Sequence, residues 1–259
     1  MEQDENSRRD FLKNAAFVVG SAFAVSSCAG ARQSGANNQN SSGTQAGKVE
    51  DEQKNGPKEK EVTAAEDLMR EHGILRRALI VYSEAAVRLR KNVSDVPPEA
   101  LQKTAKLFRT FGEDYHEKQL EEAFIFPAIK QEGGEVAGYP DILIVQHNRG
   151  REITDYITAV SNSAKIGANA KDLADALDAF ARMYETHAAR EDTIVFPAWK
   201  EGISDSQYNE LSEKFEEIEH QTFGEDGFDD AVKQIAEIES SLKLTDISQF
   251  TAPPPPPVI

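Results

Sequence analysis

Two stretches of this chain, about 70 residues apart, carry nearly the same pattern of residues. The first runs from His116 to Pro127 and the second from His187 to Pro197. Each starts with a histidine, has a carboxylate about one helical turn later, and ends an apolar run with Phe-Pro-Ala. A histidine and a carboxylate repeated in this way on the helices of a bundle are how a protein builds a site for two metal ions.

Two further histidines, His72 and His147, lie in the helical segments that precede these stretches. All four histidines fall in apolar stripes with the periodicity of a helix that packs on one face. Strand signals are nearly absent and the connections are short, so the sequence predicts an all-α fold, an up-down-up-down four-helix bundle. The helices are expected over about residues 63–91, from Pro97-Pro98 to the turn at Gly133-Gly134, over about 141–161 and over about 171–199. An additional C-terminal helix, broken near residues 224–227, is expected over about 206–239, outside the bundle.

Imidazoles and carboxylates that are buried together cost free energy unless a cation compensates them. One histidine in an apolar stripe is usually a hydrogen-bonded core residue. Four of the five histidines in such stripes, one per helix, favour a metal site instead. The chain has a single cysteine, Cys28, which excludes a thiolate site and an internal disulfide. The remaining ligand types suit iron, manganese or zinc.

The N-terminal segment has the features of an export signal. Arg8-Arg9, followed by Phe-Leu-Lys, precedes an apolar stretch over 15–25 that is too short to span a bilayer. This arrangement resembles a twin-arginine signal, and Val25-Ser26-Ser27-Cys28 resembles a lipobox, whose cysteine is acylated. We therefore expect an exported periplasmic or cell-envelope lipoprotein, anchored to the membrane through a lipid on Cys28.

The expected domain organisation follows from these features. A signal peptide is expected over 1–27, a flexible Ser-, Asn- and Lys/Glu-rich tether over 28–61, the bundle over 62–202, an accessory helical segment over 203–245 and a Pro-rich tail over 246–259. No transmembrane helix is expected after the signal. The net charge of −16 argues against nucleic acid as a partner.

The motifs resemble those of hemerythrin-like proteins, also called HHE cation-binding domains, over about residues 63–200. The matching residues are Glu71-His72, His116 with Glu121-Glu122 and Ile125-Phe126-Pro127, Gln146-His147, and His187 with Glu191 and Val195-Phe196-Pro197. The resemblance implies a four-helix bundle around a non-haem centre of two iron ions. Its implied ligands are His72, His116, Glu121, His147, His187 and Glu191. It also implies a small-molecule ligand such as dioxygen, nitric oxide or peroxide.

Two departures from the family pattern matter. Five residues separate His116 from Glu121, whereas four separate His187 from Glu191. A π-bulge near Lys118–Leu120 would return His116 and Glu121 to one face, and Glu117 and Glu122 remain additional ligand candidates. The residue four after His147 is Arg151, where oxygen carriers of this family have a second histidine, which argues against reversible oxygen transport.

Several residues on the inner faces have two possible roles. Tyr82 and Tyr184 are either ordinary core residues or hydrogen-bonding partners of a bound ligand. The small residues Gly150 and Thr154 after His147 indicate either a ligand pocket or close helix packing. His220 lies outside the repeat, where we expect a surface or supporting role rather than metal ligation.

Three functions remain open from the sequence. The first is a tethered di-iron protein that binds or senses a small oxidant. The second is an oxidase or peroxidase with the same ligands, although no acid–base dyad or nucleophile beyond them points to a particular reaction. The third is an interaction module in which the metal is structural. Zinc or manganese in place of iron is compatible with the same ligand types.

Overall fold

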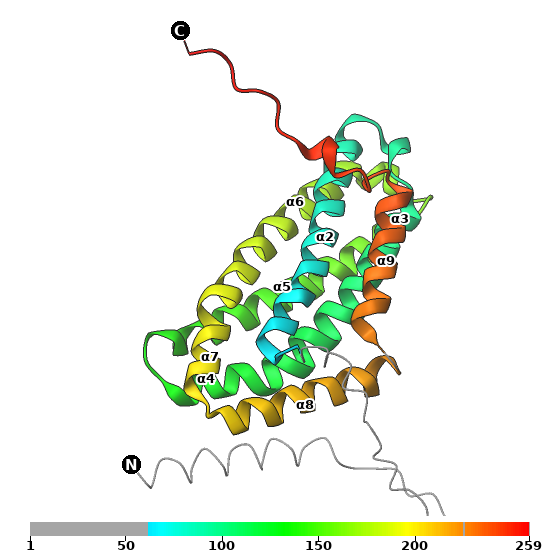
Figure 1. The fold of residues 1–259 in the computed structure, drawn as a ribbon. Coiled ribbons are helices and arrows are strands. Elements are labelled where there is room, and N and C mark those ends of the chain that lie inside the picture. Colours follow the sequence, from blue (N-terminus) through cyan, green and yellow to red (C-terminus); the bar gives the residue numbers. More distant parts are fainter. Residues whose placement is uncertain (1–61, 225, 259) are drawn as a thin grey trace, which may run out of the picture. The chain divides into compact units, whose positions relative to one another are not determined.

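The computed structural model describes residues 62–224 and 226–258. Within these ranges the secondary structure is helical, without strands, and the predicted all-α bundle with additional C-terminal helices is confirmed (Figure 1). The predicted signal peptide, the tether and Cys28 lie outside the described residues. In the described part of the chain, no helix is both long and apolar enough to cross a membrane.

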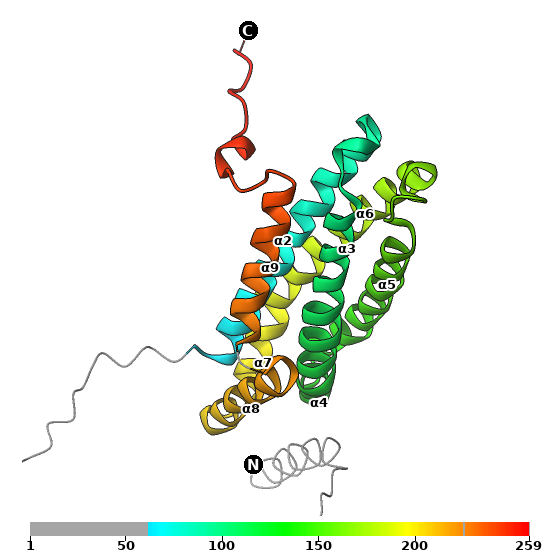
Figure 2. The ribbon, with the colours of Figure 1, turned by 90° about the vertical axis from the view of Figure 1, so that its right-hand side faces the viewer.

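Four long helical rods form the bundle. The first rod is α2 (Ala64–Lys91) and the third is α5 (Tyr139–Val160). The second rod consists of α3 (Pro98–Leu107), the π-helical η2 (Phe108–Ile125) and α4 (Phe126–Glu132). The fourth consists of α6 (Ile166–Arg190), the π-helical η4 (Glu191–Val195) and α7 (Phe196–Gly202). The first rod packs on the second and fourth, and the third also packs on the second and fourth. This ring of neighbours, joined by short turns, is the arrangement of an up-down-up-down bundle (Figures 1 and 2).

Both repeated motifs adopt π-helical hydrogen bonding, in which a backbone N–H donates to the carbonyl five residues earlier. Phe126 N–H donates to the Glu121 carbonyl, and Phe196 N–H donates to the Glu191 carbonyl. The following residue is proline in each case, which has no N–H to donate and is tolerated at the start of the next α-helical segment. The π-helical geometry predicted near Lys118–Leu120 is therefore present and extends over the whole of η2. The π-helical segment η4 was not predicted.

The C-terminal part forms two helices outside the bundle, α8 (Asp205–Phe223) and α9 (Gly227–Ser241). Ser204 begins α8 with a capping box, which satisfies the free N–H groups of its first turn. Helix α8 crosses one end of the bundle and α9 runs along α2 and α3 (Figures 1 and 2). Arg77 on α2 donates to Glu239 on α9, at 2.8 Å from Nε to Oε1.

Candidate metal centre

The six predicted ligands lie together in the middle of the bundle. Each of the four rods contributes one histidine, and the second and fourth also contribute one glutamate each. None of the six side chains is more than 3% exposed. Burial of this many ionisable groups in one place indicates a charged partner rather than packing. The six residues are His72, His116, Glu121, His147, His187 and Glu191.

The histidines face one another in two pairs. The Nε2 atoms of His72 and His116 are 3.0 Å apart, and those of His147 and His187 are 3.1 Å apart. Two nitrogen lone pairs at this distance repel each other unless a proton or a cation lies between them. Cis ligands of one ion with bonds of about 2.1 Å lie about 3 Å apart, so both pairs fit a shared metal ion.

Each glutamate lies between the two histidine pairs. Glu121 Oε1 is 3.3 Å from His116 Nε2, and its Oε2 is 3.3 Å from His147 Nε2. Glu191 Oε2 is 3.0 Å from His187 Nε2 and 3.5 Å from His72 Nε2. Each carboxylate therefore reaches one histidine of each pair, which is how a carboxylate bridges two ions.

The carboxylate oxygen atoms provide the clearest test of whether a cation fits. All four oxygen atoms of Glu121 and Glu191 are buried and have no hydrogen-bond partner among the described residues. Buried carboxylates are rarely left without hydrogen bonds, because the loss of hydration is then uncompensated. The donor set of imidazole nitrogen and carboxylate oxygen suits iron, manganese or zinc, so the residues present fit a metal.

The other ring nitrogen of every histidine is held by an oxygen atom. His72 Nδ1–H donates to Asp192 Oδ1 at 2.7 Å, and His116 Nδ1–H donates to Glu71 Oε2 at 2.5 Å. His147 Nδ1–H donates to Glu122 Oε1 at 2.8 Å, and His187 Nδ1–H donates to Gln146 Oε1 at 2.9 Å. Because these oxygen atoms accept, the proton of each neutral imidazole stays on Nδ1 and Nε2 is free for a ligand bond.

These contacts reveal an approximate two-fold repeat within the site. The residue before the first histidine of each half, Glu71 or Gln146, binds the second histidine of the same half. The residue after each of the two central glutamates, Glu121 and Glu191, crosses to the other half, so that Glu122 binds His147 and Asp192 binds His72. The phenylalanine of each Phe-Pro motif also crosses over: Phe126 stacks on His147 and Phe196 on His72, both at 5.5 Å between ring centroids.

The π-helical segment explains how unequal spacings give equivalent positions. His187 and Glu191 are four residues apart at the end of an α-helix, so they share a face. His116 and Glu121 are five residues apart within η2, where hydrogen bonds also span five residues. The wider turn thus absorbs the additional residue and brings Glu121 to the same distance range from its histidine.

The electrostatics of the histidine pairs place one proton on each pair. Burial alone would lower the pKa of His116, but the charge of Glu121 and the hydrogen bond to Glu71 outweigh it and raise this pKa well above its usual value. Burial and the charge of His116 lower the pKa of His72. The protonated His116 therefore donates from Nε2 to His72, which keeps two nitrogen atoms at 3.0 Å without a metal.

The second pair behaves in the same way. Against the effect of burial, the charges of Glu117 and Glu121 raise the pKa of His147 to about 10. Burial and the charge of His147 lower the pKa of His187 to about 3. Burial and the negative charge of Glu121 raise the pKa of Glu191, so the metal-free site also keeps a proton on this carboxyl group.

The two additional ligand candidates are already engaged by other groups. Glu122 accepts from His147 Nδ1, on the side of the ring that faces away from the histidine pair. Glu117 accepts from the Tyr184 hydroxyl and, through Oε2, from Arg151 Nη2 at 3.1 Å. Arg151 also donates to Glu122 at 2.7 Å. The residue that replaces the second histidine of oxygen carriers is therefore a cation that fixes two carboxylates beside the site.

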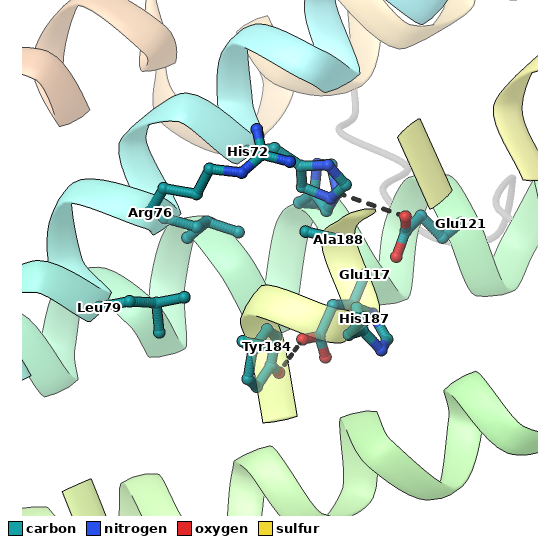
Figure 3. Close-up of a pocket in the computed structure, with 10 residues that line it drawn as sticks. His72, Arg76, Leu79, Glu117, Glu121, Tyr184, His187 and Ala188 are labelled. Atoms are coloured by element: carbon teal, nitrogen blue, oxygen red, sulfur yellow. Dashed lines mark hydrogen bonds and ion pairs between the residues drawn. The ribbon is translucent and has the colours of Figure 1, made fainter. Parts of the chain in front are cut away.

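A small cavity of about 10 Å³ adjoins the site between α2, η2 and α6. This volume is room for about one water-sized molecule. Tyr184 and Glu117 point toward each other at its wall (Figure 3). Its lining comprises His72, Leu75, Arg76, Leu79, His116, Glu117, Glu121, Tyr184, His187 and Ala188.

The cavity lies on a different side of the site from Gly150 and Thr154, the small residues of α5 that were considered as the lining of a ligand pocket. Gly150 and Thr154 do not line the cavity; they serve helix packing, the other role considered for them. A Cβ atom at Gly150 would lie 2.4 Å from the Tyr184 hydroxyl oxygen, and Thr154 donates to Glu113 at 2.5 Å. Tyr82 is buried among aromatic rings and is not one of the residues that line the cavity, whereas Tyr184 is.

Replacing Gly150 by alanine is expected to destabilise the protein by about 1–3 kcal/mol, because the new methyl group would overlap Tyr184. The matched control is Gly73→Ala in α2, where a Cβ atom meets nothing within 4 Å. That change is expected to stabilise the protein by about 0.5–1 kcal/mol through helix propensity. Chemical denaturation of the two variants measures both effects, and equal shifts would contradict the close approach of Gly150 and Tyr184.

His220 is exposed on α8, outside the set of converging residues, consistent with a surface position. By contrast, the sequence analysis did not predict the residues that hold the Nδ1 side of the histidines. Asp192 and Arg76 were not singled out, and no role was assigned to Glu71 or Gln146. A signal was present: each of the first histidines and each bridging glutamate has a polar neighbour in the chain, repeated in both halves.

A helical bundle with four facing histidines and two carboxylates between them defines a metal-binding four-helix protein. The chain matches the model of the Hemerythrin HHE cation binding domain over residues 63–199, more than half of its length. The chain therefore belongs to the hemerythrin HHE family, whose members bind metal cations, typically iron, and it is a metal-binding protein.

Three curated relatives share 45% identity with the chain over 192 residues, which is 73% of this chain and 74% of each relative. They are uncharacterized proteins from Mycobacterium bovis and from two strains of Mycobacterium tuberculosis. No solved structure matches the chain.

Proposed function

We propose that the protein is a non-haem di-iron protein that binds or senses a small oxidant, namely dioxygen, nitric oxide or peroxide, outside the cytoplasmic membrane. One observation carries the proposal: two histidine pairs face each other, and between them lie two buried carboxylates whose oxygen atoms have no hydrogen-bond partner within residues 62–224 and 226–258. In this proposal His72 and His116 hold one ion, His147 and His187 hold the other, and Glu121 and Glu191 bridge them.

The number of ligands leaves room for a small molecule. Two six-coordinate ions have about twelve positions, of which four imidazoles and two bridging carboxylates occupy about eight. Bound iron would supply redox and Lewis-acid chemistry toward a small oxidant. The protein contributes the rest: the Nδ1 partners fix the rings, the buried surroundings restrict water, and the cavity beside Tyr184 limits the size of the ligand.

The location outside the cytoplasmic membrane is part of the proposal and depends on the N-terminal sequence. The paired arginines and the Cys28 motif support export in the folded state and a lipid anchor. A Cys28→Ser variant is then expected to move from the membrane fraction to the soluble fraction of the cell envelope. Retention of this variant in the membrane would contradict the lipid anchor.

Metal analysis combined with optical spectroscopy, first without oxygen and then in air, tests the di-iron centre. The expected result is about two iron ions per chain and a change in the near-ultraviolet absorption on exposure to air, both lost in His187→Ala. The control is His220→Ala, which removes an exposed histidine from α8. Zinc in place of iron, or an unchanged spectrum in air, would contradict oxidant binding. Steady consumption of peroxide would instead indicate an enzyme with the same ligands.

Metal loading is expected to release protons, because His116, His147 and Glu191 have raised pKa values and keep their protons in the metal-free site. The protons must leave before Nε2 and the carboxylate can bind a cation. Metal affinity should therefore rise with pH, by about tenfold per pH unit for each proton released. Calorimetric titrations in buffers of different ionisation enthalpy count the protons, and a pH-independent affinity would contradict this assignment.

A further inference from the structure

One of the departures from the approximate two-fold repeat of the site gives it an open side and a closed side. Arg76 and Arg151 occupy equivalent places, four residues after His72 and His147. Arg76 donates to Asp192, and Arg151 donates to Glu122, the equivalent of Asp192. Up to this point the two halves match.

The two arginines differ in what else they reach. Arg151 also donates to Glu117 and to the Glu113 carbonyl, and its side chain is only 20% exposed. Among the described residues Arg76 has no contact equivalent to the one between Arg151 and Glu117, and its side chain is 41% exposed. The residue that follows the second histidine explains the difference, because it is Glu117 after His116 but Ala188 after His187.

A methyl group in place of a carboxylate leaves space. The cavity beside the site lies on this side, where both Ala188 and Arg76 line it. On the other side the corresponding space is filled by Glu117, which Tyr184 and Arg151 hold in place. Figure 3 shows Arg76 and Leu79 on α2 and Ala188 on α6 around the cavity.

We propose that small ligands reach the centre between α2 and α6, through a mouth formed by Ala188 and Arg76, while the Glu117 side is closed. The proposal rests on the proposed function, since it concerns access to the same centre. The cavity has room for about one water-sized molecule, so this route favours the smallest ligands. Leu75 and Leu79 make one wall apolar, and Tyr184 with Glu117 makes the inner wall polar.

Arg76 determines which ligands of this size are favoured. Of the residues that line the cavity, Arg76 is the arginine, and its side chain is 41% exposed. The chain as a whole has a net charge of −16. A small anion that approaches an acidic protein is repelled in general but attracted near Arg76. The mouth is thus expected to admit both neutral and anionic ligands, with the arginine accelerating only the anions.

Rapid-mixing measurements of azide binding to the ferric protein and nitric oxide binding to the ferrous protein test the mouth. Ala188→Leu fills the cavity side and is expected to slow the association of both ligands by at least about tenfold. The matched control is Ala189→Leu, which adds the same side chain at the next, half-buried position and should leave both rates within about twofold. If Ala188→Leu does not retain iron, Ala188→Val takes its place.

Arg76→Gln tests the effect of the positive charge separately from the effect of the size of the mouth. It is expected to slow azide by about three- to tenfold more than it slows nitric oxide at low salt, because any change that reaches the centre through Asp192 affects both ligands whereas the lost charge affects the anion alone. Arg77→Gln, a neighbouring arginine that pairs with Glu239, is its control. Iron-loaded Ala188 variants with unchanged rates, or faster association in Glu117→Ala together with unchanged rates in Ala188→Leu, would place the access route elsewhere. Wild-type protein that binds no iron would contradict the proposed function itself.

Discussion

Replacing Glu191 by glutamine is expected to stabilise the metal-free protein and, at the same time, to prevent the uptake of two ions. In the metal-free protein the gain should be about 1 kcal/mol, which raises the melting temperature by about 2–4 °C. In the presence of metal the variant should melt below the wild type. A residue that serves only the fold cannot give opposite signs under these two conditions.

The opposite signs follow from the surroundings of the carboxyl group. Glu191 is fully buried, and neither of its oxygen atoms has a hydrogen-bond partner in the part of the chain that the structure describes. Burial and the charge of Glu121 raise the pKa of this carboxyl group. Glutamine has the same shape and is neutral without taking up a proton, so it avoids the free-energy cost of protonating a buried glutamate on folding at neutral pH. A cation reverses the balance, because it needs the negative charge that glutamine lacks.

Thermal unfolding with a chelator and with added metal measures both signs for Glu191→Gln, and metal analysis measures the loading. The matched control is Glu185→Gln, an exposed glutamate on the same helix, whose effect should stay within about 0.5 kcal/mol under both conditions. Destabilisation of the metal-free protein by Glu191→Gln would mean that the carboxylate has a structural partner, and the argument for a cation at this position would fail.

Metal loading is expected to raise the melting temperature of the wild-type protein by about 10 °C or more. An ion present at a hundred times its dissociation constant stabilises the folded state by about 2.7 kcal/mol, and two ions by about twice that. For a domain of this size each 1 kcal/mol corresponds to about 2–4 °C. Scanning calorimetry of the metal-free and loaded forms measures the shift.

The stabilisation by metal should depend on the ligands in a specific way. His187→Ala is expected to lose most of the shift, because it removes one ligand of a pair and leaves His147 without its partner. His220→Ala should retain all of it, since His220 is exposed outside the site. A melting temperature that does not respond to metal would show that these buried groups are stable without a cation.

Most of the fold could be predicted from the sequence because its determinants are local. The helical spacing of apolar residues, Pro98 at a helix start and the turn at Gly133-Gly134 fix the helices and their limits to within a few residues. The convergence of the histidines was also predictable, since each falls in the stripe that faces the core. The five-residue spacing from His116 to Glu121 was enough to predict π-helical geometry there.

What could not be predicted depends on contacts between helices. The crossing of Asp192 to His72 joins residues 120 positions apart and becomes visible only when α2 and η4 are adjacent. The second π-helical turn was missed because the spacing from His187 to Glu191 is regular, so nothing in the count of residues demanded it. A pocket beside Gly150 was one of two roles considered for the small residues of α5, and the other, helix packing, is what the structure shows. The cavity lies beside Ala188 instead, and nothing in the sequence singled out Ala188 until it could be compared with Glu117 at the equivalent position.

The exchange of contacts between the two halves has a consequence for the mechanical integrity of the molecule. Glu121 belongs to the first helical hairpin but reaches His147 of the second, and Glu191 belongs to the second but reaches His72 of the first. A cation bound there would therefore link the two hairpins, whose only covalent connection is the backbone between them. The single cysteine excludes an internal disulfide, so a bound ion would be a reversible cross-link between the hairpins. Its loss would make separation of the hairpins easier.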